Sequence, residues 1–334
     1  MLRKPWKMLA AVALSATLAG TSAIAEDADY ILNTASTGGT YHPVGTAIAT
    51  LSKVKLLPKQ KFSLTAVNSA GSGANVQALA ANTAQFAILQ GLFGSYAATG
   101  TGPVSEPQTN MRSVSMLWQN VEHFVLATDM VKEGTVSDLL AAKGATMTMG
   151  KENSGTLGSN KVLVENLTGG NLDEYYSLLY AGYGPSSDAL ANGNAVGGGY
   201  PAGPPVSALT KLMSTNGDKF SILGVTPEEA AKMDGGRNLW VPYTLAAGTY
   251  PGQDKDIETI AQPNFLAVNA DVDEEHVYQL TKAIYENLPF LQAIHSATKA
   301  MDVNAALAGL PVPLHPGAAR YYEEVGLTIP DSLR

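Results

Sequence analysis

Cysteine is absent from the sequence. Its absence excludes disulfide bonds and thiol chemistry, and it also excludes a lipid anchor attached to a cysteine behind an export signal. Beyond residue 25, the sequence contains no run of about 18 continuous apolar residues, which is the length that a membrane-spanning helix needs. We therefore expect a mature protein that is not inserted in a membrane.

Arginine is scarce after residue 25, where it occurs only at positions 112, 237, 320 and 334. None of these arginines lies in a glycine-rich turn, so the sequence does not indicate a bidentate arginine clamp on a ligand carboxylate. The formal net charge is −8, and lysine and arginine form no run that would follow the phosphates of a nucleic acid. Nucleic acid is therefore an unsuitable partner, although local dipoles can still bind a small anion.

Compact catalytic and metal-binding patterns are also missing. The five histidines are scattered and form no H-E-x-x-H motif, and the sequence contains no G-x-S-x-G elbow, P-loop or dinucleotide fingerprint. We predict no metal, no cofactor and no catalytic residue. One alternative stays open, a secreted hydrolase in which His42 activates Ser154 or Ser72, but the remaining acid–base groups that it needs are absent from the pattern.

The first 25 residues have the three parts of a secretory signal peptide. A basic start with Arg3, Lys4 and Lys7 precedes an apolar run over residues 9–18 and a small-residue cleavage site at residues 23–25. We expect export to a bacterial periplasm as a free protein. The chain that remains is long enough for about two domains with their own cores.

The most informative segment is S-T-G-G-T-Y-H-P at residues 36–43. A short apolar strand over residues 30–35 precedes it, and apolar residues at helical spacing follow it from Val44 to Leu51. Gly38 and Gly39 permit a tight turn, which directs unpaired N–H groups and the positive end of the helix dipole at one point. This geometry favours an anion. The alternative is a glycine turn that binds nothing.

The same pattern of strand, polar turn and helix recurs along the chain. Residues 62–67 predict a second strand that ends in a glycine- and serine-rich turn, and residues 86–90 predict a third that ends in Gln90. Alternating strands and helices are typical of an α/β fold with a parallel sheet, in which ligands bind at the carboxyl ends of the strands.

A second lobe is predicted from the middle of the chain. We assign residues 26–120 to the first lobe, 121–258 to the second, and 259–334 to a strand that returns to the first lobe and to C-terminal helices. In the second lobe, the polar turn at 150–157 opens another helix. Two helix starts in different lobes can close on one small anion, although both can equally be ordinary α/β turns.

The sequence resembles the TAXI-type solute receptors of TRAP (tripartite ATP-independent periplasmic) transporters. S-T-G-G-T-Y-H-P-V-G at 36–45 is similar to the family's opening T-G-G-T-Y-Y-P-V-G, and G-S-G-A-N-V at 71–76 continues the likeness. The strand at 86–90, the turn at 150–156 and D-A-L at 188–190 extend it over most of the chain.

The resemblance implies a two-lobed periplasmic binding protein fold, similar to type II, with a ligand cleft between lobes that crossing strands join. It also implies a small organic anion such as glutamate, glutamine or a 2-oxoglutarate-like dicarboxylate, delivered to the membrane permease subunits of a TRAP transporter. A receptor that serves a membrane sensor kinase is an alternative. The ligand-binding residues carried over from the family are Thr37, Gly38, Gly39, Thr40, Tyr41, Ser72, Asn75, Gln90, Ser154, Gly155, Thr156 and Tyr200.

The sequence departs from the family pattern at two places. His42 stands where the family commonly has tyrosine, and N-A-V-G-G-G at 194–199 replaces a strand of bulkier residues. We expect the three glycines either to enlarge the pocket or to bring the backbone close to a ligand.

Overall fold

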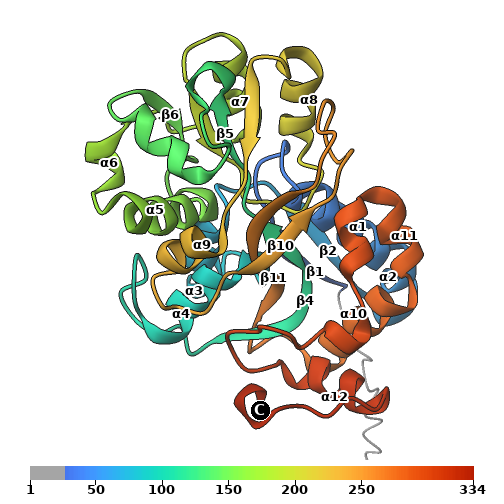
Figure 1. Cartoon of the computed structure of the whole chain (residues 1–334). Coiled ribbons are helices and arrows are strands. Elements are labelled where there is room, and N and C mark those ends of the chain that lie inside the picture. Colours follow the sequence, from blue (N-terminus) through green and yellow to red (C-terminus); the bar gives the residue numbers. More distant parts are fainter. Residues whose placement is uncertain (1–26) are drawn as a thin grey trace, which may run out of the picture.

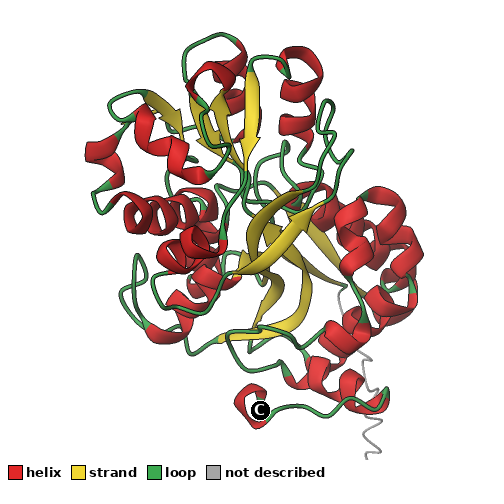
Figure 2. Cartoon of the chain, in the orientation of Figure 1, coloured by secondary structure: helices red, strands yellow, loops and turns green. Residues whose placement is uncertain are grey.

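The computed structural model describes residues 27–334. Within this range the chain forms two α/β lobes, each with its own sheet and its own covering of helices (Figures 1 and 2). The predicted two-lobed α/β fold is confirmed. The predicted signal peptide at residues 1–25 lies outside the described residues.

Lobe 1 is built on a six-stranded sheet with the order β10-β11-β3-β1-β2, in which β4 also pairs with β11. The first three strands are parallel to one another, as the alternating pattern predicts, while β11 runs antiparallel to β3, β4 and β10. The strands are β1 (Ala28–Asn33), β2 (Phe62–Val67), β3 (Phe86–Gln90), β4 (Met111–Val121), β10 (Val241–Leu245) and β11 (Ile257–Asn269).

The helices of lobe 1 pack against this sheet through their apolar faces. Val44 and Ile48 of the first helix are fully buried against Leu32 and Ile88 of the sheet, at the helical spacing expected from the sequence. The helices of lobe 1 are α1 (Tyr41–Lys55), α2 (Leu57–Gln60), α3 (Ser72–Ala80), α4 (Gly91–Thr99), α10 (Glu274–Glu286), α11 (Leu288–Ile294) and α12 (Pro316–Glu324).

From the sequence, Val277, Leu280, Ile284 and Leu288 predict one helical stripe through residues 273–294, and this prediction is wrong in one respect. The helix stops at Asn287 and a new one begins at Leu288. Pro289 lies in the first turn of the second helix, where its missing N–H costs nothing, whereas inside one continuous helix it would break a hydrogen bond.

Lobe 2 is built on a five-stranded sheet with the order β7-β6-β8-β5-β9. The strands are β5 (Phe124–Ala127), β6 (Thr146–Thr148), β7 (Ser177–Leu178), β8 (Gly197–Gly199) and β9 (Phe220–Leu223). The helices are α5 (Gly155–Thr168), α6 (Leu172–Tyr175), α7 (Tyr183–Ala191), α8 (Ser207–Asn216) and α9 (Pro227–Asp234). Short 3₁₀ segments occur in the two lobes at Thr128–Met130, Val136–Ala142, Ser296–Ala300, Val303–Ala305 and Asp331–Leu333.

Two local predictions in lobe 2 need correction. The segment Y-Y-S-L-L-Y at 175–180 predicts a strand, but only Ser177 and Leu178 form one, and Tyr175 belongs to the helix α6. Asn171 begins α6 because its side chain accepts a hydrogen bond from the N–H of Asp173, a local signal that outweighs the strand propensity of the tyrosines. The serines and aspartate at 186–188 predict a helix cap, but the helix begins at Tyr183, three residues before Ser186.

The chain crosses between the lobes at Glu122 and His123, which join β4 to β5. β11 runs beside this crossing, since the N–H of Glu122 donates to the carbonyl oxygen of Ile260 at 2.9 Å. Strand β10 belongs to the sheet of lobe 1, although its residues fall in the range 121–258 assigned to lobe 2. The residue boundaries of the lobes otherwise stay a prediction.

The three glycines of β8 serve protein packing. A Cβ at Gly197 would lie 2.6 Å from the carbonyl oxygen of Val125, and one at Gly198 would lie 2.5 Å from that of Thr148. One at Gly199 would overlap the side chain of Asn160. The strand does not line the cavity described below. Its glycines let neighbouring strands and α5 approach closely, which corrects the expectation of a larger pocket.

From residue 27 onward, the chain contains no helix with the length and apolar character needed to span a bilayer.

Candidate functional site

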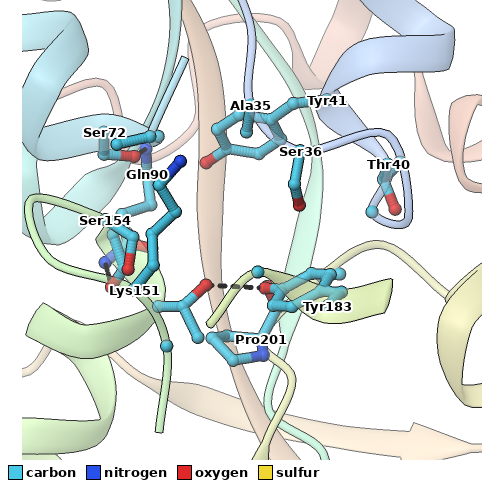
Figure 3. Close-up of a pocket in the computed structure, with 18 of the residues that line it drawn as sticks. Ala35, Ser36, Thr40, Tyr41, Ser72, Gln90, Lys151, Ser154, Tyr183 and Pro201 are labelled. Atoms are coloured by element: carbon cyan, nitrogen blue, oxygen red, sulfur yellow. Dashed lines mark hydrogen bonds between the residues drawn. The ribbon is translucent and has the colours of Figure 1, made fainter. Parts of the chain in front are cut away.

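A small cavity lies between the two lobes (Figure 3). Its volume is about 40 Å³, and since one water needs about 10–15 Å³ on this measure, it has room for a compact molecule. The residues that line it are Ala35, Ser36, Gly39, Thr40, Tyr41, Ala70, Gly71, Ser72, Gln90, Gly150, Lys151, Ser154, Gly155, Thr156, Ala181, Gly182, Tyr183, Pro201 and Ala202.

Lobe 1 directs helix starts at the cavity. α1 begins directly after Thr40, and α3 begins at Ser72 after Gly71, whose φ of 121° suits glycine. Each helix follows the carboxyl end of a parallel strand, so the fold itself brings the two turns together. The first N–H groups of each helix have no acceptor within the helix.

Lobe 2 directs two more helix starts at the same cavity. α5 begins after Ser154, whose Oγ accepts a hydrogen bond from the N–H of Leu157 at 3.0 Å. α7 begins at Tyr183 after Gly182. The positive ends of helix dipoles from both lobes therefore face one small space, which favours a negatively charged group there.

The lobes also contact each other directly around the cavity. The Gln90 side-chain amide donates to the carbonyl oxygen of Gly155 at 2.9 Å, and Thr40 Oγ1 donates to that of Gly203 at 2.6 Å. A Cβ at Gly155 would lie 2.6 Å from Gln90 Oε1, so this position accepts only glycine without displacement. The arrangement is a closed one.

Two buried tyrosines form walls of the cavity. The hydroxyl of Tyr41 donates to Asn264 Oδ1, and that of Tyr183 donates to the carbonyl oxygen of Pro201 while lying 2.8 Å from Thr156 Oγ1. Burial raises the pKa of both tyrosines well above the usual range. Both hydroxyls therefore stay neutral and serve as hydrogen-bonding groups.

Lys151 was missed as a candidate binding residue. The pair Lys151–Glu152 reads from the sequence as a solvated loop, but Lys151 is the one charged residue among the described residues that line the cavity. Its side chain extends into the cavity, toward the side that carries Ser72 and Tyr41 (Figure 3). The only available signal was its place at the start of the polar turn at 150–157.

The structure brings most of the predicted ligand-binding residues to this cavity. Those that line it are Gly39, Thr40, Tyr41, Ser72, Gln90, Ser154, Gly155 and Thr156. Their role in binding stays a prediction. Ser36 and Tyr183 are further lining residues that were not among the predicted ligand-binding residues, although Ser36 opens the segment at 36–43.

Four predicted residues lie outside the lining, namely Thr37, Gly38, Asn75 and Tyr200. Thr37 is exposed. The Asn75 amide is fully buried and donates to the carbonyl oxygens of Thr34 and Ile88, so it fixes α3 against the ends of two strands. Tyr200 is also buried, with its ring 5.5 Å from that of Tyr183, and supports the wall from behind.

The residues of the hydrolase alternative are not arranged for that chemistry. Nδ1 of His42 lies 3.1 Å from Thr34 Oγ1, and His42 does not line the cavity with Ser72 and Ser154. Across residues 27–334, no three histidine or carboxylate side chains cluster in a way that would hold a metal ion.

Solved structures show the same fold in periplasmic binding proteins. The protein is similar to a periplasmic binding protein named BugD, with 15% identity, a TM-score of 0.52 and coverage of 89% of this chain and 93% of that one. It is also similar to PhnD1 from Prochlorococcus marinus in complex with methylphosphonate, with 12% identity and a TM-score of 0.52. The match covers 82% of this chain and 91% of that one.

A third similar structure is a binding protein component of an ABC phosphonate transporter from Pseudomonas aeruginosa, with 11% identity and a TM-score of 0.51. The match covers 81% of this chain and 79% of that one. At these identities the likenesses establish the two-lobed fold. At the level of sequence, residues 32–326 match the NMT1-like family, and the chain belongs to that family.

Proposed function

We propose that this protein is a periplasmic solute-binding receptor that traps a small organic anion between its lobes and delivers it unchanged to a membrane permease. The cavity carries this proposal, because helix starts from both lobes and the side chain of Lys151 face one space between the lobes. These groups can bind and orient an anion, and its negative charge satisfies N–H groups that otherwise lack partners.

We further propose that the transporter is of the TRAP type and the receptor of the TAXI type. The opening segment at residues 36–45 supports this assignment, since it resembles that of TAXI receptors. The resemblance favours glutamate, glutamine or a 2-oxoglutarate-like dicarboxylate as the ligand. The phosphonate-binding proteins of the same fold support a role in import and add phosphonates to the candidates.

Closure follows from contacts that only the closed form makes. Ser72 of lobe 1 and Ser154 of lobe 2 both line the cavity, so an anion bound there would touch both lobes together, and it would lose one set of contacts when the lobes separate. A ligand shifts the population toward the state that it contacts best. Glu122 and His123, at the crossing between lobes, lie where a hinge motion would bend the chain.

A thermal-shift screen tests the proposal. Amino acids, carboxylates, dicarboxylates, phosphonates and sulfonates would each be added to the purified mature protein, followed by calorimetry on every compound that raises the melting temperature. A true ligand at 100 times its Kd adds about 2.7 kcal/mol to stability. The proposal predicts one ligand site per chain with anionic ligands only. A preference for cations or neutral sugars would contradict it.

A further inference from the structure

No acidic side chain lines the cavity, as far as residues 27–334 are concerned. A ligand ammonium group needs a carboxylate or several carbonyl acceptors to replace its water, because a buried charge without a partner is strongly unfavourable. The side chains that line the cavity supply hydroxyls, one amide and the amino group of Lys151 instead.

The fixed charges of the cavity are also positive. Lys151 points into it, and four helices begin at its wall with their positive ends inward. In the described part of the chain, no carboxylate lies within 4.0 Å of the Lys151 amino group, so its charge is available to a ligand. An ammonium group would be repelled by the same features that attract an anion.

Two acidic residues, one beside Lys151 in the chain and one at the crossing between the lobes, lie outside the lining of the cavity. Glu152 follows Lys151 in the chain but is exposed, and its charge acts on the pKa of Tyr180. Glu122 is fully buried at the crossing between the lobes, with Oε1 occupied by Ser159 and Trp240, and it is not a lining residue.

Resting on the proposed function, we infer that the ligand is a compact anion without an ammonium group, and that Lys151 sets this selectivity. The inference divides the candidate ligands into two groups. Dicarboxylates and simple phosphonates or sulfonates meet the requirement because they carry no ammonium group, whereas glutamate, glutamine and other amino acids do not.

Matched pairs of ligands test the inference, since their members differ only by an amino group. Suitable pairs are succinate and aspartate, propionate and alanine, and ethylphosphonate and 2-aminoethylphosphonate. Calorimetry with the wild-type mature protein is expected to give at least about tenfold tighter binding for the amino-free member of any pair that binds. Equal or tighter binding of the aminated member would overturn the inference while leaving the proposed receptor function intact.

Variants at Lys151 test the assigned residue. Lys151→Met is expected to weaken binding of the amino-free ligand at least about tenfold, and Lys151→Glu to reduce or invert the preference within the pair. Lys143→Met is the matched control, because Lys143 lies over the Tyr175 ring in the same lobe and does not line the cavity.

A merely structural role for Lys151 would lower the melting temperature of both Lys151 variants and leave the pair preference unchanged, which would overturn the assignment. If neither member of any pair binds the wild-type protein, the proposed function fails instead, and the two failures are thereby distinguished.

Discussion

At the scale of single residues, Glu122 lies at the crossing between the lobes with its carboxyl fully buried. Its Oε1 accepts hydrogen bonds from Ser159 Oγ at 2.7 Å and from Trp240 Nε1 at 2.8 Å, while its Oε2 has no partner among the described residues. Burial raises the pKa of this carboxyl to about 7. The charged form is therefore costly in the folded protein.

This raised pKa predicts a pH dependence of stability. The folded protein holds the Glu122 proton at pH values where the unfolded chain has lost it, so the contribution of Glu122 to stability falls as the pH rises from 4.5 to 7. Glu122→Gln removes the titration. The free energy of unfolding of the variant, relative to wild type, should rise by up to about 3 kcal/mol across this range.

Urea unfolding of both proteins at about pH 4.5 and about pH 8 measures the effect. Burial lowers the pKa of neighbouring His123 to about 4, but that group titrates in both proteins and largely cancels in the difference. A difference that stays constant with pH would show that Glu122 does not titrate in this window.

Ser154 and Thr37 form a matched pair for ligand binding. Ser154 lines the cavity and caps α5, whereas Thr37 is exposed and lies outside the lining. Ser154→Ala should weaken ligand binding by about 1–3 kcal/mol and lower stability by about 1 kcal/mol. Thr37→Ala should leave the calorimetric Kd nearly unchanged, although the sequence motif alone predicts a loss at both positions. An equal loss of ligand affinity in the two variants would indicate that the ligand also contacts Thr37, which would contradict the cavity as the site.

At the scale of elements, strands and helix starts are readable from the sequence where local signals agree. The strands at 62–67 and 86–90 have the predicted bounds, because β-branched and apolar residues are bounded there by polar or glycine residues. α6 and the break at Asn287 were missed because one cap or one proline outweighs the surrounding pattern.

Strand β8 gives a prediction at this scale. Gly198→Ala would place a Cβ against the side chain and carbonyl of Thr148, so we expect a loss of about 1–3 kcal/mol in the free energy of unfolding. Gly170→Ala is the control, since its Cβ would lie 3.6 Å from Tyr175 Cδ2 and 4.0 Å from Thr168 Oγ1, both ordinary van der Waals contacts. Thermal and urea unfolding measure both. Equal stability of the two variants would mean that the sheet of lobe 2 can shift locally to accommodate a Cβ at Gly198.

At the scale of the whole molecule, the site depends on which turns meet across the lobes. The sequence shows that residues 36–43 and 150–157 are polar helix starts, but it contains no local signal for the contact between Gln90 and Gly155 or for the inward direction of Lys151. Tyr183 was missed for the same reason, because its place in the wall is set by tertiary packing.

Lobe closure can be blocked at one position. Gly155→Val would place a Cβ 2.6 Å from Gln90 Oε1 and 2.8 Å from Ser72 Oγ, which is too close for the lobes to keep their present contact. We expect about tenfold weaker ligand binding, because the added side chain would keep the two lobes apart. Each lobe should still fold, because the clash lies between the lobes and not within either one. Calorimetry and circular dichroism measure the two properties. Wild-type affinity would show that closure around this cavity is not required.

The central claim is that the cavity between the lobes holds a small anion and leaves it chemically unchanged. Mass spectrometry of the molecule released by denaturing the ligand-loaded protein tests this directly. The account predicts about one equivalent of an anionic ligand per chain, recovered with the mass of the compound that was added. Recovery of a product of different mass, or of no bound anion from any compound in the screen, would contradict it.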